Sequence, residues 1–306
     1  MRRHYTIPLP RRAQLLLGPR TLVMGILNIT PDSFADGGLH FDVARAVEAG
    51  AQMEADGADI IDVGGESTRP GAEPLPAGEE LRRVIPVIRG LAARVRIPIS
   101  IDTYKAEVAR AAIDSGASIV NDISGLRDAG LADVCARTGA ALVLMHTRTA
   151  PKSKLLDPDL YDDVVEDVIG FLRERMEVAA SHGVTPEQIL IDPGPDFAKT
   201  PAQTLEVLAR LTELHVLERP ILLAISRKDA LGALTGRGPR ERLAGTLAAL
   251  ADGADRGAHM ARIHDVREAT DFLAVRGALR GRLQVQRDLH LPESLRRVAP
   301  SDGPGR

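Results

Sequence analysis

The chain has 306 residues and a formal net charge of -3, which gives no sign of a general nucleic-acid-binding surface. Its apolar runs stay shorter than the ~18 residues that a membrane span needs. The single Cys135 excludes an intrachain disulfide and suits a reducing compartment. The N-terminus is broken by prolines and lacks the apolar segment of a signal peptide, so we expect a cytoplasmic protein without membrane or nucleic-acid partners.

Short apolar runs alternate along the chain with longer segments of helical periodicity. The runs predict strands at Leu22–Leu27, Asp59–Val63, Ile97–Ile101, Ser118–Asn121, Ala141–His146, Gln188–Ile191, Pro220–Ile225 and Met260–Ile263. The periodic segments predict helices at Asp42–Asp56, Gly78–Val95, Lys105–Ser115, Leu131–Thr138, Tyr161–His182, Pro201–Leu211, Pro239–Arg256 and Val266–Leu279. Several helices end at a Gly-Ala pair, such as Gly139-Ala140, because glycine suits the left-handed position after a helix.

The strict alternation of strands and helices predicts an α/β fold with a parallel sheet. Eight such units in a chain of this length indicate a closed TIM (β/α)8 barrel, with a doubly wound open sheet as the alternative. We expect a short hairpin in residues 1–20 that closes the bottom of the barrel. The barrel itself is expected over residues 21–281, followed by a poorly ordered tail over residues 282–306.

Polar residues at the carboxyl ends of the predicted strands are the candidate site, because barrel enzymes take their catalytic groups from there. Asp102, Asn121 and Asp192 suit a flat heterocycle with N–H donors, since a buried carboxylate is costly without a partner. A second, mostly cationic group suits phosphate. Its members are Asn28, Arg69, Lys228, Arg262 and His264. The two groups together predict a site for a polar heterocycle beside a phosphate ester.

Six motifs follow one another at the spacing of one known family. They are GILNITPDSFADGG from Gly25, GGESTRPGA from Gly64, IDTYKAEVA from Ile101, IVNDISG from Ile119, SRK from Ser226 and RIHDV from Arg262. On these motifs the chain resembles the dihydropteroate synthases of the pterin-binding barrel superfamily. The resemblance covers roughly Thr21 to Leu279, and six motifs in order are far more specific than one.

The resemblance implies a transferase of folate biosynthesis that condenses 6-hydroxymethyl-7,8-dihydropterin diphosphate with 4-aminobenzoate and releases diphosphate. It also implies Mg²⁺ as the cofactor and a homodimer formed through outer helices near the C-terminus. The residues that match the family's pterin contacts are Asp102, Asn121, Asp192, Phe197 and Lys228, with Asp102, Asp192 and Lys228 implied to be catalytic. Those that match diphosphate contacts are Asn28 (through Mg²⁺), Thr68, Arg262 and His264. Those that match aminobenzoate contacts are Phe34, Arg69, Pro70 and Ser226.

The turn after the sixth strand departs from the family's glycine-rich GxGFGK pattern. It carries Asp196 and Ala198 where the family has glycine, and Asp196 either adds a carboxylate beside the pterin pocket or pairs with Lys199. We therefore weigh two alternatives. One is a pterin-binding paralogue with weak or no synthase activity, and the other is a methyltetrahydrofolate-dependent corrinoid methyltransferase. The phosphate-binding cations argue against the methyltransferase.

Other polar residues have structural explanations. The structural alternative for Asn28 is that it caps a turn and takes no part in a binding site. We expect His146 to pack in the barrel wall and Glu66 to hold loop backbone, and neither to take part in chemistry. Lys105 is expected to be a solvated charge on the first turn of a helix.

Overall fold

The computed structural model of the chain describes residues 3–29, 42–66, 74–151, 153 and 155–296. Four of the predicted site residues lie outside these ranges. They are Phe34, Thr68, Arg69 and Pro70.

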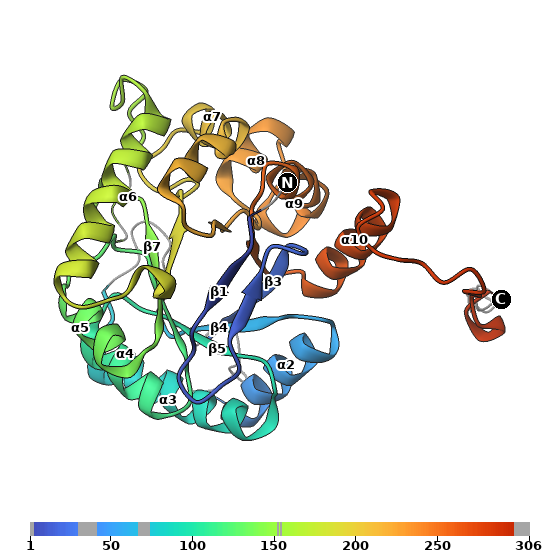
Figure 1. Cartoon of the computed structure of the whole chain (residues 1–306), viewed down its shortest axis with the longest axis horizontal. Coiled ribbons are helices and arrows are strands. Elements are labelled where there is room, and N and C mark those ends of the chain that lie inside the picture. Colours follow the sequence, from blue (N-terminus) through green and yellow to red (C-terminus); the bar gives the residue numbers. More distant parts are fainter. Residues whose placement is uncertain (1–2, 30–41, 67–73, 152, 154, 297–306) are drawn as a thin grey trace, which may run out of the picture.

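Within the described residues, eight parallel strands form one sheet that curves into a barrel (Figure 1). They are β3 (Leu22–Asn28), β4 (Ile60–Gly64), β5 (Ile99–Asp102), β6 (Ile119–Asp122), β7 (Ala141–Met145), β8 (Ile189–Asp192), β9 (Leu222–Leu223) and β10 (Met260–Ile263). The strands pair in the order β8-β7-β6-β5-β4-β3-β10-β9, and a parallel bridge between Ile191 and Ile221 joins the two ends. The predicted barrel is therefore confirmed, and the open sheet is excluded.

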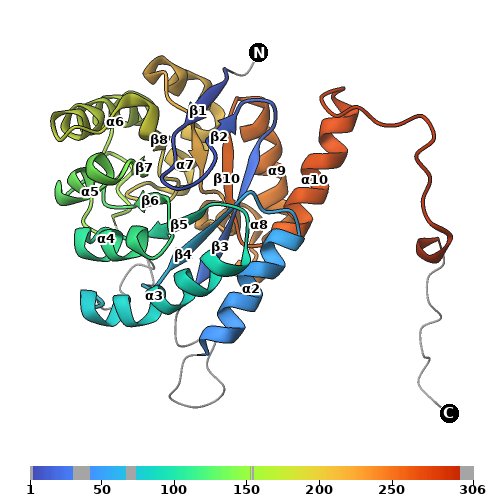
Figure 2. The same ribbon diagram turned by 60° about the horizontal axis from the view of Figure 1, so that its bottom comes forward.

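Helices surround the barrel and alternate with its strands (Figure 2). They are α2 (Val43–Ala55), α3 (Ala77–Arg94), α4 (Ala106–Asp114), α5 (Gly130–Thr138), α6 (Val164–Ser181), α7 (Pro201–Ala209), α8 (Asp229–Thr235), α9 (Leu243–Asp255) and α10 (Val266–Leu279). Helix α6 begins later than the predicted Tyr161, because Asp163 caps it. The carboxylate of Asp163 accepts the backbone N–H groups of Val165 and Glu166 at 2.8 and 3.0 Å.

The chain between β9 and α9 differs from the prediction. The strand predicted over Pro220–Ile225 is regular only at Leu222–Leu223, and the unpredicted helix α8 follows it. The helix predicted to begin at Pro239 is a short 3-10 helix, Pro239–Glu241, before α9. With seven residues and Gly232 in its interior, α8 is too short to show a helical pattern in the sequence.

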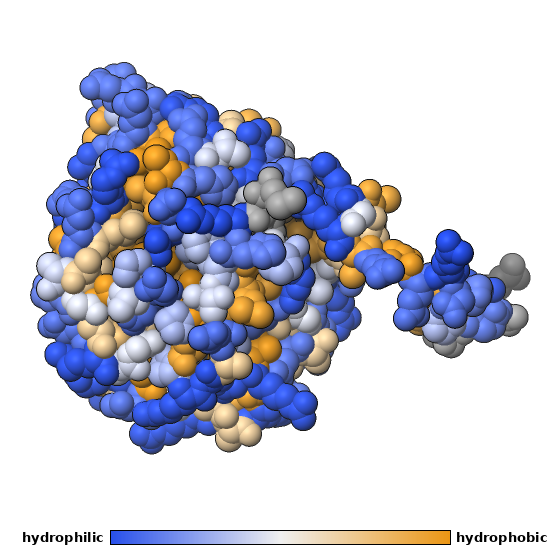
Figure 3. All heavy atoms as spheres, viewed as in Figure 1, coloured by the Kyte–Doolittle hydropathy of each residue, from blue (hydrophilic) through white to orange (hydrophobic). Residues whose placement is uncertain are grey.

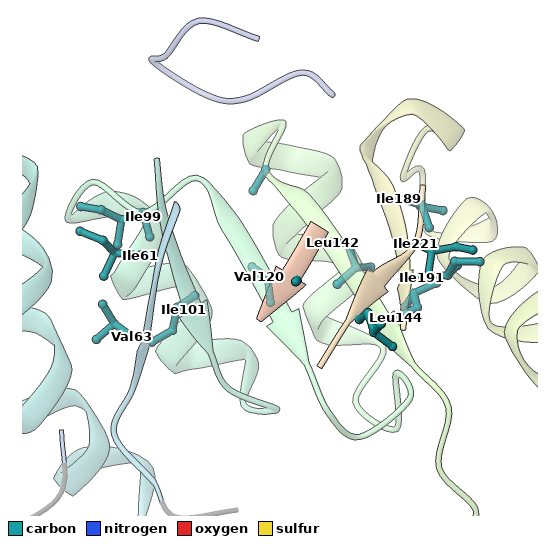
Figure 4. Packing of buried hydrophobic residues seen from close by; sticks show 14 of the residues in the cluster. Ile61, Val63, Ile99, Ile101, Val120, Leu142, Leu144, Ile189, Ile191 and Ile221 are labelled. Carbon is teal, nitrogen blue, oxygen red and sulfur yellow. The ribbon is translucent and has the colours of Figure 1, made fainter. Parts of the chain in front are cut away.

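Alternation of side chains along the strands separates two apolar layers. Outward-facing residues of β4 to β8 pack against the helices, among them Val63, Ile101 and Leu144 (Figure 4). The inward-facing layer contains Met24, Ile60, Ile119, Val143, Leu190, Leu222 and Met260. The N-terminal hairpin of β1 (Tyr5–Ile7) and β2 (Leu15–Leu17) adds Ile7, Leu9 and Leu17 to this inner layer. The expected hairpin is confirmed, and apolar residues fill the barrel at that end.

The chain beyond α10 leaves the barrel (Figures 1 and 2). Apolar residues gather where it departs (Figure 3), and Leu279, Leu283 and Val285 are all exposed there. Residues 280–293 are exposed throughout, and a short 3-10 helix, Glu293–Leu295, lies near the end of the described segment. In the part of the chain that the structure describes, no helix is both long enough and apolar enough to cross a bilayer.

Candidate active site at the carboxyl ends of the strands

The register of the sheet aligns polar strand ends in one row. Asn28 pairs with Gly64, Gly64 with Asp102, and Asp102 with Asn121, while Asp192 ends β8. Residues that are far apart in the sequence therefore stand side by side at the carboxyl edge of the barrel. The opposite end is filled by the apolar inner layer, so the polar groups of the interior collect at this mouth.

Arg262 joins two carboxylates from inside the barrel. Its Nε donates to Oδ2 of Asp62 and its Nη2 donates to Oδ2 of Asp102, each at 2.6 Å. Asn121 Nδ2 donates to the same Asp62 oxygen at 3.0 Å. Among the described residues, the other oxygen of Asp62, Oδ1, has no hydrogen-bond partner. No role was predicted for Asp62, although its place two residues before the end of β4 puts it on the inner face with Gly64.

Burial dominates the protonation of the acidic residues. It raises the pKa of Asp102 to about 7, an effect that Arg262 opposes and that the negative charge of Asp62 reinforces. It also raises the pKa of Asp192, although the backbone N–H of Gly194 donates to its Oδ1 at 2.8 Å. A ligand that brings N–H donors or positive charge favours the ionised carboxylates. This group of residues is therefore suited to such a ligand.

Lys228 lies at the start of α8 and completes this cluster. Its Nζ is 4.6 Å from the centre of the Phe197 ring. Burial lowers the pKa of Lys228, and the carboxylates of Asp196 and Asp192 partly offset that effect. An ammonium over an aromatic face and beside a carboxylate can donate to the edge of a flat polar ring.

The turn after β8 keeps the glycine that its backbone needs most. A Cβ added to Gly194 would lie 2.1 Å from the carbonyl oxygen of His146, and the φ of Gly194 is +64°. Asp196 and Ala198 also have positive φ, at 68° and 51°. Asp adopts this region readily, whereas Ala there costs on the order of 1 kcal/mol. The turn thus keeps backbone angles that favour glycine, although two of these positions are occupied by Asp196 and Ala198.

Lys199 is buried beneath this turn. Its Nζ lies 2.7 Å from Nδ1 of His146 and donates to the carbonyl oxygens of Gly194 and Phe197 at 3.0 and 3.2 Å. Burial lowers the pKa of Lys199 to about 7. Burial and the nearby Lys199 lower the pKa of His146 to about 4, and its Nε2 lies 2.9 Å from Asp167. His146 packs in the barrel wall as predicted, and it also links Lys199 to an acidic residue.

Asp196 does not form the pair with Lys199 that was one of its expected roles. Its carboxylate accepts the backbone N–H groups of Asp229 and Ala230 at the start of α8 instead. Lys228 precedes those two residues directly, so Asp196 does lie beside a predicted pterin contact.

Ser226 and His264 meet at the ends of neighbouring strands. The hydroxyl oxygen of Ser226 accepts the backbone N–H of His264 at 3.1 Å and lies 3.0 Å from its Nδ1. Burial, followed by the positive charge of Arg227, lowers the pKa of His264 to about 4. The ring is therefore neutral near pH 7, and it would contact an anion as a hydrogen-bond donor rather than as a cation.

Lys105 is not the solvated charge that we predicted. Its Nζ pairs with the carboxylates of Glu66 and Glu80, both of which are buried. Oε1 of Glu66 accepts the hydroxyl of Tyr104 at 2.8 Å and the backbone N–H of Leu75 at 3.2 Å. The predicted role of Glu66 in holding loop backbone is confirmed. The spacing of these residues along the chain gave no hint that Lys105 lies between two carboxylates.

One oxygen atom at the mouth is suited to a divalent cation, that of the Asn28 amide. A Cβ added to Gly64 would lie 3.7 Å from Oδ1 of Asn28, so this oxygen lies close beside Gly64 at the mouth. Oδ2 of Asp102, 3.6 Å from the same point, already accepts Nη2 of Arg262. Among the described residues there is no group of three or more His, Cys, Asp and Glu side chains placed to hold a metal ion. A single amide oxygen fits an ion that takes most of its ligands from water and a phosphorylated substrate, as Mg²⁺ does.

The comparisons with known proteins agree with this geometry. Residues 24–264 match the family model described as pterin binding enzyme. The dihydropteroate synthase of Escherichia coli K12 is 45% identical over 253 residues, which make up 83% of this chain and 89% of that protein. A probable bifunctional folylpolyglutamate synthase/dihydropteroate synthase of Haloferax volcanii is 46% identical over 262 residues. These are 86% of this chain, which spans only 31% of that longer protein.

Solved structures extend the similarity to three dimensions. Xanthomonas albilineans dihydropteroate synthase with 4-aminobenzoic acid gives a TM-score of 0.82 at 45% identity, with 90% of this chain and 98% of that chain covered. The same enzyme in complex with 7,8-dihydropteroate gives a TM-score of 0.79 at 43% identity, over 89% of this chain and 99% of that chain. The fold and the site define a pterin-binding barrel enzyme. More narrowly, the chain belongs to the dihydropteroate synthase family, whose members are transferases.

Proposed function

We propose that the protein condenses 6-hydroxymethyl-7,8-dihydropterin diphosphate with 4-aminobenzoate to give 7,8-dihydropteroate and diphosphate. The observation that carries this proposal is the connected set of Asp102, Arg262, Asp62 and Asn121 at the barrel mouth. The related Xanthomonas enzyme binds 4-aminobenzoic acid and 7,8-dihydropteroate, which would be the second substrate and the product here.

The pterin would lie against the acidic side of the mouth. Asp102, Asn121 and Asp192 present buried oxygen and amide groups, and the Phe197 ring with the Lys228 ammonium adds an aromatic face and a donor. A dihydropterin has N–H donors along its edge and ring acceptors beside them. Binding it would add N–H donors to the buried carboxylates, beyond Arg262 on Asp102 and the Gly194 N–H on Asp192.

The chemistry needs negative charge near the methylene carbon of the pterin. The amine nitrogen of aminobenzoate forms a bond to that carbon while the C–O bond to diphosphate breaks, and the nitrogen then loses a proton. Positive charge develops on the methylene and spreads into the pterin ring. Ionised Asp102 would stabilise this charge, and the same positive charge would favour ionisation of a carboxyl group whose pKa is near 7.

The diphosphate would leave on the side of Arg262, His264 and Asn28, with Thr68 added from outside the described residues. Arg262 Nη1 takes part in neither of the ion pairs of that side chain, so it is placed to donate to an anion. Neutral His264 would donate a hydrogen bond. The Asn28 oxygen would hold Mg²⁺, which when bound would neutralise charge on the leaving diphosphate.

Aminobenzoate would approach over Ser226, which lies beside His264 at the mouth. The other residues proposed for this substrate, Phe34, Arg69 and Pro70, lie outside the described residues. An arginine suits the aminobenzoate carboxylate, because its guanidinium can donate two parallel hydrogen bonds.

Release of diphosphate tests the proposal directly. The protein is mixed with the pterin diphosphate, 4-aminobenzoate and Mg²⁺, and diphosphate and dihydropteroate are measured together. We expect both products in equal amounts and neither without aminobenzoate. Lys228→Ala should weaken pterin binding and turnover, whereas Arg282→Ala, an exposed residue beyond α10, should behave as the wild type.

Other results would assign the protein to one of the alternatives. Pterin binding without release of diphosphate would identify a pterin-binding paralogue. Transfer of a methyl group from methyltetrahydrofolate to a corrinoid would identify a methyltransferase.

We also propose that the protein acts as a homodimer in the cytoplasm. Exposed Val275 and Leu279 on α10 support a contact between copies through this helix, and the buried free thiol of Cys135 is compatible with a reducing compartment. Light scattering after size-exclusion chromatography tests the dimer, and Leu279→Glu should favour the monomer.

A further inference from the structure

The turn that follows β8 holds the helix that follows β9. Asp196 lies in this turn, 33 residues before Asp229, the first residue of α8. Its Oδ2 accepts the backbone N–H of Asp229 at 2.5 Å, and its Oδ1 accepts the backbone N–H of Ala230 at 3.3 Å. These are amides of the first helical turn, which have no partners within their own helix.

Lys228 occupies the N-cap position of α8 and makes no capping hydrogen bond with its own side chain. A cap normally comes from the residue at that position. Here it comes from a different strand end, so the capping carboxylate also fixes the position of α8 relative to β8. Lys228 is then free to point its side chain at Phe197.

The turn that carries Asp196 is itself anchored. Lys199 donates to the carbonyl oxygens of Gly194 and Phe197, and Thr204 of α7 donates to Oδ1 of Asp196 at 3.3 Å. The backbone N–H of Asp196 donates in return to the hydroxyl of Thr204 at 3.1 Å. Lys199 therefore fixes the backbone of the turn, and Thr204 fixes the carboxylate of Asp196.

One turn thus contacts both ends of Lys228. Asp196 bonds the two peptide groups that follow Lys228, and the Phe197 ring lies 4.6 Å from its ammonium. Neighbouring residues of the β8 turn therefore set where the lysine backbone lies and where its charge points. Asp196 itself has left-handed backbone, with a φ of 68°.

We propose that Asp196 is a positioning residue for the pterin site, which caps α8 from the β8 turn and thereby places Lys228. The inference rests on the proposed function, because that function assigns Lys228 to the pterin. Asp196 would act through Lys228 and would not itself touch substrate. Loss of Asp196 would therefore weaken binding of the pterin substrate and leave binding of aminobenzoate unchanged.

Three variants separate the cap from the backbone angle. Asp196→Gly removes the carboxylate, with its cap and its Thr204 hydrogen bond, and suits the positive φ, so any loss reflects the missing carboxylate and not strain. Asp196→Asn keeps an acceptor oxygen in a residue that also tolerates this angle. Ala198→Gly is the matched control, because it relieves a second positive φ in the same turn and removes no side-chain hydrogen bond.

For Asp196→Gly we expect the KM for the pterin diphosphate to rise about tenfold, with the KM for aminobenzoate unchanged. In Asp196→Asn the KM for the pterin diphosphate should stay close to that of the wild type. Ala198→Gly should keep both KM values of the wild type. Hydrogen exchange of the Asp229 and Ala230 amides should accelerate in Asp196→Gly and not in Ala198→Gly.

A wild-type KM for the pterin substrate in Asp196→Gly would overturn the proposal, and so would an equal rise in both KM values. Faster exchange at those amides together with unchanged kinetics would show a cap that serves helix stability alone. If the wild-type protein bound no dihydropterin diphosphate in a calorimetric titration, the proposed function would fail first. The role of Asp196 would fail with it.

Discussion

The ammonium of Lys199 lies 2.7 Å from Nδ1 of His146, and both groups are fully buried in the wall of the barrel. The three acceptors that Lys199 contacts, His146 Nδ1 and the carbonyl oxygens of Gly194 and Phe197, are all uncharged near pH 7. A buried cation among neutral acceptors is stabilised less than one beside a carboxylate. This relationship makes the stability of the turn after β8 sensitive to pH.

The free energy of unfolding of the wild type should rise with pH above 7, and Lys199→Met should abolish this rise. Burial lowers the pKa of folded Lys199 to about 7, whereas an unfolded chain keeps a value near 10.4. Between these values only the unfolded chain carries the proton, so the free energy of unfolding rises with pH by up to ~1.4 kcal/mol per unit. Urea unfolding from pH 7 to 10 measures the slope. A Lys199→Met protein with the wild-type slope would contradict the assignment.

Asp102→Asn should impair turnover more than binding. The change keeps the size of the side chain and an acceptor oxygen but removes charge where positive charge develops on the pterin. We expect kcat to fall by about 10²- to 10³-fold, with the dissociation constant of the pterin substrate changed only a few-fold. Single-turnover kinetics and a binding titration measure the two quantities separately. Normal turnover in this variant would show that the electrostatic role is wrong.

Asp62→Asn should shift the pH dependence of the reaction. The charge of Asp62 contributes to the raised pKa of Asp102, after the larger effect of burial. Removing it should lower that pKa, so the rise of kcat/KM with pH near 7 should move to lower pH. The wild-type and variant pH profiles measure the shift. A rise that stays in place or moves to higher pH would exclude a coupling between these carboxylates.

Lys105→Met should destabilise the protein by about 3–5 kcal/mol, because it leaves the buried carboxylates of Glu66 and Glu80 without their cation. The matched control is Arg82→Met. Arg82 pairs with Glu79 on the surface, where its side chain is 74% exposed, so the loss should stay within about 1 kcal/mol. Chemical denaturation of both variants tests the contrast. Equal losses of stability in the two variants would show that the buried ion pairs of Lys105 stabilise the protein no more than an exposed pair.

Local patterns in the sequence predicted much of the fold. Glycine after a helix is one example, because Gly57, Gly116, Gly139 and Gly257 all have positive φ as the Gly-Ala pairs suggested. Among the described residues, Asn28, Asp102 and Asp192 likewise end strands, as the change from apolar to polar residues predicted. Both features depend on neighbours a few residues away, and such preferences are visible in a linear chain.

The sequence alone therefore determined the class of the fold, the order of its elements and most of the polar groups at the barrel mouth. Only the tertiary structure decided which of those groups meet. Arg262 contacts Asp62 across 200 residues of sequence, Lys105 contacts Glu66 across 39 and Asp196 caps α8 across 33. The tertiary structure also decided that the barrel closes through a bridge between Ile191 and Ile221. Such contacts depend on strand register and on packing between remote elements, and no local pattern of residues encodes them.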